Sequence, residues 1–181
     1  MNTQIYRKKL FPPSAIMAAF LLSFCYWIYL ALTSHMIIQF DAIGYEHLGS
    51  RIHNQEWIEY FRTGPNREPL YPLLISLSKD LGNVLSVPFS TIQTFIQVIL
   101  LFSTQLLVYL FLKKFDINTV ISALTLFYIG VSPALVNATF SLFSEIASFP
   151  IVLGLIWVNV KSWRAVQDNL LIRTFLHSYL F

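Results

Sequence analysis

The sequence predicts an all-α integral membrane protein with about four transmembrane helices and a long outer loop that contains amphipathic helices. Hydrophobic residue types make up 56% of the 181 residues and charged types only 12%, whereas soluble domains carry about 25% charged residues. Several apolar runs are long enough to cross a hydrocarbon core of ~30 Å at ~1.5 Å per residue. We therefore treat residues 1–181 as a single membrane domain.

Charge and metal-binding residue types exclude several other classes of protein. The formal net charge is +3, and no basic run is long enough to form a nucleic-acid patch, so no nucleic-acid partner is expected. The single cysteine, Cys25, lies in an apolar run and excludes a disulfide framework. His47 and His53 are six residues apart and do not share a helix face, so no metal site is expected.

The first predicted span lies near residues 11–33, within a run of 24 uncharged residues. The apolar region of a signal peptide is ~7–15 residues long. This run is longer, which favours a helix retained in the membrane.

Residues 35–88 form the long polar loop, with six acidic and four basic residues. Within it, the spacing of Asp41, Tyr45, Leu48 and Ile52 predicts a helix over 41–60 that lies on the membrane surface. A turn-rich break, TGPNREP, follows. The next segment, PLYPLLISLSKDLG, predicts a short apolar helix that is too short to span a bilayer.

Three further spans are predicted near residues 89–112, 117–139 and 141–160. With both chain ends in the cytoplasm, eight of the twelve basic residues lie inside and four lie in the outer loop. This arrangement follows the positive-inside rule. It places the loop in the periplasm or an organelle lumen, and a bacterial inner membrane is the favoured location.

Asp41 is the first candidate for chemistry, because it follows the first span at the start of a predicted helix. A carboxylate there meets the positive end of the helix dipole and stays ionised. It could accept a proton from an attacking hydroxyl or amine at the membrane boundary. The alternative is a helix N-cap, a position that favours Asp.

Two other charged residues are candidates for binding. Glu145 lies in the fourth predicted span, on roughly one face with Ser141, Ser144 and Ser148. Such a polar seam faces a cavity or forms hydrogen bonds between helices. Arg67 suits a lipid phosphate because its guanidinium binds bidentately, although a solvated pair with Glu68 is the alternative.

The order of these motifs resembles the N-terminal part of the GT-C membrane glycosyltransferases, the branch of protein mannosyltransferases and aminoarabinose lipid A transferases. An Asp-x-x-x-Tyr follows the first span, an Arg-x-Pro-x-Tyr-Pro segment ends the outer loop, and a Ser-Pro precedes a Ser-Glu. The matching residues are Asp41, Tyr45, Arg67, Pro69, Tyr71, Pro72, Ser132, Pro133, Ser144 and Glu145.

The resemblance implies transfer of a sugar from a polyprenyl-phosphate carrier to an acceptor on the outer face. Asp41 would act as the base, and Arg67, Tyr71, Glu145 and Tyr45 would bind substrate. Members of the family have more spans, so we expect this chain to be a truncated part that is inactive alone and that a second chain could complete. The alternative is a non-catalytic membrane subunit of a polysaccharide assembly or export system. A transporter is disfavoured because no internal repeat is visible.

Overall fold

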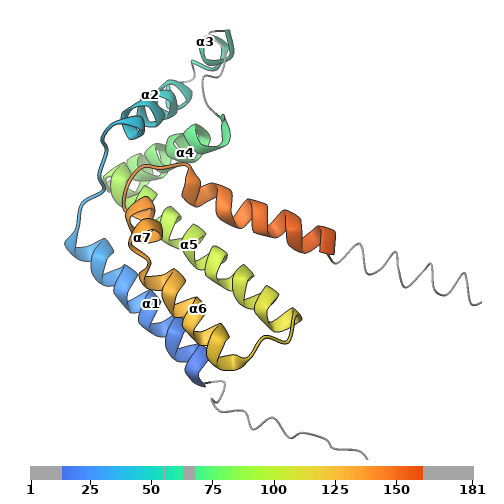
Figure 1. Cartoon of the computed structure of the whole chain (residues 1–181). Helices are drawn as coiled ribbons and strands as arrows, with labels where there is room; N and C mark the ends of the chain where they lie inside the picture. Colours follow the sequence, from blue (N-terminus) through green and yellow to red (C-terminus); the bar gives the residue numbers. More distant parts are fainter. Residues whose placement is uncertain (1–13, 55, 63–67, 161–181) are drawn as a thin grey trace, which may run out of the picture.

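The computed structural model describes residues 14–54, 56–62 and 68–160, and within these residues it contains helices and no β-strand (Figure 1). The all-α prediction is therefore confirmed for the described part of the chain. In chain order the helices are α1 (Ser14–Thr33), α2 (Asp41–His53), α3 (Trp57–Arg62), α4 (Leu70–Leu85), α5 (Phe89–Lys114), α6 (Thr119–Val131), α7 (Pro133–Thr139) and a last helix, Glu145–Val160.

Two of the described helices, α1 and α5, are long and apolar enough to cross a membrane, and α6 with α7 makes a third if the bent pair is one span. These two or three apolar helices are compatible with a membrane protein. The pair bends by 46°, so the predicted run 117–139 is not one straight helix. The bend lies at Pro133, which lacks the backbone donor of a continuous helix, and Ser132 before it is extended, with φ −57° and ψ 119°.

The last helix begins at Glu145, four residues later than the predicted start of the fourth span at 141. Its 16 described residues cover about 24 Å, which is less than the ~30 Å of a hydrocarbon core. Ser141 is not helical, because it forms a parallel bridge with Ile37.

Helices α1, α5 and α6 pack side by side (Figure 1). Phe20 of α1 contacts Tyr109 near the end of α5, with ring centroids 5.9 Å apart, so these two helices run antiparallel. Polar side chains also hold this bundle together. Gln105 Nε2 donates to Ser23 Oγ at 3.0 Å, and Trp27 Nε1 donates to the Gly130 carbonyl at 2.7 Å.

Helix α2 packs on α4 at one end of this bundle (Figure 1). The contact is close because Gly49 has no side chain: a Cβ there would lie 2.5 Å from Cγ2 of Ile75. The prediction of one helix over 41–60 is wrong, since α2 ends at His53 and α3 begins at Trp57. Between them, the Glu56 amide donates to the Arg51 carbonyl at 3.0 Å.

The face that α2 buries also differs from the prediction. Tyr45 and Ile52 are buried as expected, but Asp41 is exposed and Leu48 is only partly buried. Ala42 and Gly49 take the remaining buried positions. Small residues on the face of α2 that meets α4 allow the two helices to approach closely.

Candidate functional site at the α2–α4 end

Two segments meet at this end of the bundle: the one that connects α1 to α2 and the one that connects α7 to the last helix. The Ile37 amide donates to the Phe140 carbonyl at 3.0 Å, and the Leu142 amide donates to the Ile37 carbonyl at 3.2 Å. Four residues beyond this pairing each segment enters a helix, one at Asp41 and the other at Glu145. Both helices therefore begin with an exposed acidic residue.

Asp41 is the first helical residue of α2 and not its N-cap, which is Phe40. The capping interpretation of Asp41 is therefore wrong. In the first turn its carboxylate still lies at the positive end of the helix dipole. Phe40 has a positive φ of 51°, so the backbone turns sharply just before the acidic residue.

Tyr45, one turn after Asp41, joins α2 to the segment that leads into the last helix. Its hydroxyl and the Ser144 hydroxyl are 2.8 Å apart, and its hydroxyl donates a long hydrogen bond of 3.4 Å to Glu68 Oε2. Its ring meets the Tyr71 ring edge to face, with centroids 5.1 Å apart. Aromatic pairs of this geometry add about 0.5–1.5 kcal/mol beyond their buried area.

Tyr71 lies beneath Tyr45 on α4 and is buried. Gln97 Nε2 donates to the Tyr71 hydroxyl at 2.6 Å and to the Ser141 carbonyl at 3.0 Å. Burial raises the pKa of Tyr71 most strongly, the neighbouring Gln93 side chain lowers it, and the negative charge of Glu145 raises it. The net shift is upward, so the hydroxyl stays protonated near neutral pH.

Sequence reasoning missed two glutamines of α5, Gln93 and Gln97, which are fully buried at the base of this cluster. Gln93 Oε1 accepts a hydrogen bond from Ser78 Oγ at 2.5 Å. Gln93 Nε2 and Gln97 Oε1 have no hydrogen-bond partner among the described residues. The signal for both residues was their four-residue spacing inside an apolar run, which places two amides on one helix face.

The structure thus brings three predicted site residues together: Tyr45, Tyr71 and Glu145. The predicted polar seam around Glu145 is different, because Ser141 and Ser144 precede the helix. Ser141 and Ser144 turn into the cluster, while Glu145 and Ser148 are exposed. Arg67 lies outside the described residues.

Charged groups next to the cluster join α2 to α4. Lys79 Nζ donates to Glu46 Oε1 at 3.2 Å and to Ser50 Oγ at 2.7 Å. His53 Nδ1 and Asp80 Oδ1 are 2.7 Å apart. Within the described residues, no group of three His, Cys, Asp or Glu residues is placed to hold a metal ion.

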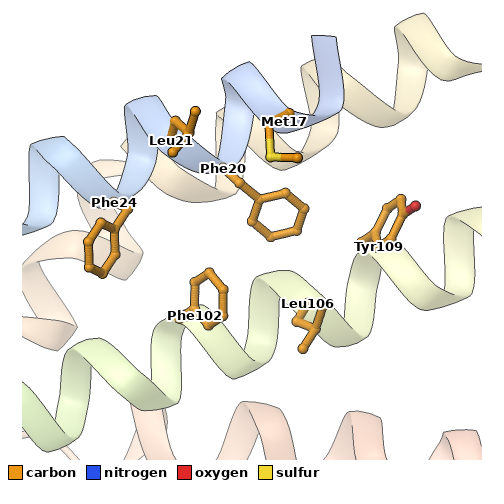
Figure 2. A pocket seen from close by; sticks show the side chains of 7 residues that line it. All are labelled: Met17, Phe20, Leu21, Phe24, Phe102, Leu106 and Tyr109. Carbon is orange, nitrogen blue, oxygen red and sulfur yellow. The ribbon is translucent and has the colours of Figure 1, made fainter. Parts of the chain in front are cut away.

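A separate apolar groove of about 420 Å³ lies between α1 and the second half of α5 (Figure 2). Phe20 points toward Phe102 and Tyr109 across it (Figure 2). The groove is lined by Met17, Phe20, Leu21, Phe24, Phe102, Leu106 and Tyr109. Because these side chains offer almost no polar group, the groove suits an apolar occupant and not a reacting polar group.

No protein-family model, curated protein or solved structure matches the chain.

Proposed function

We propose that the chain works as a GT-C-type membrane glycosyltransferase, which transfers a sugar from a polyprenyl-phosphate carrier to an acceptor at the outer face of a bacterial inner membrane. The observation that carries the proposal is the meeting of Tyr45, Tyr71 and Glu145 beside the exposed start of α2. These residues come from three parts of the chain, and each lies in a segment that resembles a motif of that family.

The proposed topology has four membrane segments, namely α1, α5, the bent α6–α7 pair and the helix that begins at Glu145. The 35–88 loop then lies in the periplasm. The antiparallel packing of α1 and α5 supports it, because that packing puts the loop and the α5–α6 turn at opposite ends. The exposed carboxylate of Glu145 on an apolar helix supports a second chain or further spans that complete the site.

In the proposed reaction Asp41 accepts the proton of the acceptor hydroxyl. The acceptor oxygen then bonds to the anomeric carbon of the sugar, and the bond from that carbon to the carrier phosphate breaks. The phosphate leaves with the bonding electrons, and Arg67 stabilises its charge. Tyr45, Tyr71 and Glu145 bind and orient the sugar or the acceptor.

The test is sugar transfer in membranes of the native host, with the chromosomal copy replaced by Asp41→Asn. Polyprenyl-phosphate mannose and polyprenyl-phosphate aminoarabinose serve as labelled donors. Asn keeps the size of Asp but cannot accept the proton, so transfer should fall by about 10²–10⁴-fold at matched expression. Glu56→Gln, which neutralises another exposed loop carboxylate, is the control and should retain activity. Asp41→Asn activity within a few-fold of wild type would remove the base role.

A non-catalytic membrane subunit is the second candidate, and one observation favours it. The hydroxyls of Tyr45 and Tyr71 are both engaged in hydrogen bonds between elements. If the cluster is only a scaffold, Tyr45→Phe should lower stability by about 1 kcal/mol, while sugar transfer in Asp41→Asn membranes should equal that of wild type.

A further inference from the structure

Helix α4 has a long exposed apolar face opposite the side that packs on its neighbours. Residues spaced 4, 3 and 4 apart are buried: Tyr71, Ile75, Ser78 and Gly82. Residues spaced 3, 4, 4 and 4 apart are exposed and form what we call the leucine stripe: Leu70, Leu73, Leu77, Leu81 and Leu85. Helical geometry places the stripe on one continuous face of the helix.

The two charged side chains of α4 bind α2. Lys79 lies opposite the leucine stripe, and Asp80 lies at its edge, seven residues after Leu73. Lys79 binds Glu46 of α2, and Asp80 binds His53 of α2. Helix α4 therefore has a polar side that faces α2 and an apolar side with no protein cover among the described residues. This division is typical of a helix that lies in a membrane interface.

The link between α4 and α5 places the stripe at the edge of a membrane-crossing segment. Only residues 86–88 separate the two helices. The link is tight, because the Val87 amide donates to the Gly82 carbonyl at 3.0 Å and Ser86 is left-handed, with φ 56°. Ser78 of α4 also binds Gln93 of α5, so α4 cannot move away from the head of that span.

We propose that α4 lies in the outer membrane interface, with the leucine stripe among the lipid acyl chains and α2 on the water side. The surface helix predicted over 41–60 is then not the one that contacts lipid. Helix α5 also exposes apolar side chains, Phe95, Ile99, Phe102 and Leu106, the last two at the open groove beside α1. This favours lipid as the occupant of both exposed faces. The inference is independent of sugar transfer and requires only that α5 crosses the bilayer.

Site-directed spin labelling tests this on the full chain in vesicles of phosphatidylethanolamine and phosphatidylglycerol. Cys25→Ala removes the single native thiol, and labels go on Leu73→Cys, Leu77→Cys and Leu81→Cys. These positions are exposed, so the labels should not disturb packing. The spin labels should be more accessible to oxygen than to a water-soluble nickel complex. The ratio of the two accessibilities should place them about 5–10 Å below the headgroups.

Two further labels are the controls. Asn83→Cys, on the polar side of α4, should show the reverse preference, and Ile99→Cys, exposed on α5, should lie deeper than the stripe. If the labels on the leucine stripe are as accessible to the nickel complex as the label on Asn83→Cys, that face lies in water and the proposal is overturned. Stripe labels shielded from both reagents would show that protein covers the face, which also overturns it.

Discussion

At the residue scale, Phe40 has a backbone conformation that rarely suits a side chain. Its φ of 51° and ψ of −121° match the first central position of a type II′ turn. The Ala42 amide closes that turn on the Gln39 carbonyl at 3.0 Å. Glycine normally occupies such a position, and a non-glycine residue costs about 1–3 kcal/mol. The strain lies immediately before Asp41, where it fixes how the chain enters α2.

Phe40→Gly should therefore be more stable than Phe40→Ala by about 1 kcal/mol, since only glycine relieves the strain. The Phe40 side chain is 86% exposed, so its loss affects both variants alike. Thermal unfolding midpoints in detergent measure the difference. If the alanine variant is equally or more stable, Phe40 carries no such strain.

Sequence reasoning singled out two residues of the polar cluster. A resemblance to GT-C motifs pointed to Tyr45 and Tyr71, and the structure puts their rings in contact. Gln97 was not predicted, because its partner atoms include the Ser141 carbonyl, which becomes available only when the segment before Glu145 is non-helical. Long-range pairing of that kind leaves no local signal in a sequence.

At the element scale, the length and composition of a helix are easier to predict than its neighbours. The run 89–112 became α5, with two more residues at its end. The buried face of α2 was misjudged because hydrophobicity favours Leu48 over Gly49. Close approach to α4 favours the opposite choice, since the smaller residue permits it.

Alanine substitutions at Gly49, in the α2–α4 contact, and at Gly154, in the last helix, should have opposite effects on stability. Gly49→Ala would put a Cβ against Ile75 and 3.2 Å from the Pro72 carbonyl, and overpacking of this kind costs about 1–3 kcal/mol. Gly154→Ala has open space within 4 Å, so it should gain up to about 1 kcal/mol from helix propensity. Unfolding midpoints of the two variants are compared in one detergent.

A second substitution separates the contact from other effects of Gly49→Ala. Ile75→Ala removes Cγ2, the atom nearest to the new Cβ, and keeps the Cβ of residue 75 at 2.7 Å. The clash is then partly relieved, so the double variant should lose less stability than the sum of the single variants. Simple additivity, or a stabilised Gly49→Ala protein, would contradict the packing derived from the structure.

At the scale of the whole molecule, the arrangement of the helices makes the topology testable. Helices α1 and α5 are antiparallel, so the segment between them and the α5–α6 turn lie at opposite ends of the bundle. The proposed topology counts eight basic residues on the cytoplasmic side, and two of them, Lys113 and Lys114, lie in the last turn of α5. The helix packing separates the two ends, and the proposed orientation of those ends rests on the charge distribution.

We predict that a membrane-impermeant maleimide labels Glu56→Cys in cells whose outer membrane alone has been permeabilised. The same reagent should label Ile117→Cys only after the inner membrane is permeabilised as well. Both positions are exposed, and Cys25→Ala provides the background. Neither substitution changes a basic residue, so the charges that set orientation are preserved. Labelling of Ile117→Cys in intact cells, with Glu56→Cys protected, would invert the topology. It would also move Asp41 to the cytoplasmic face, where the proposed reaction does not take place.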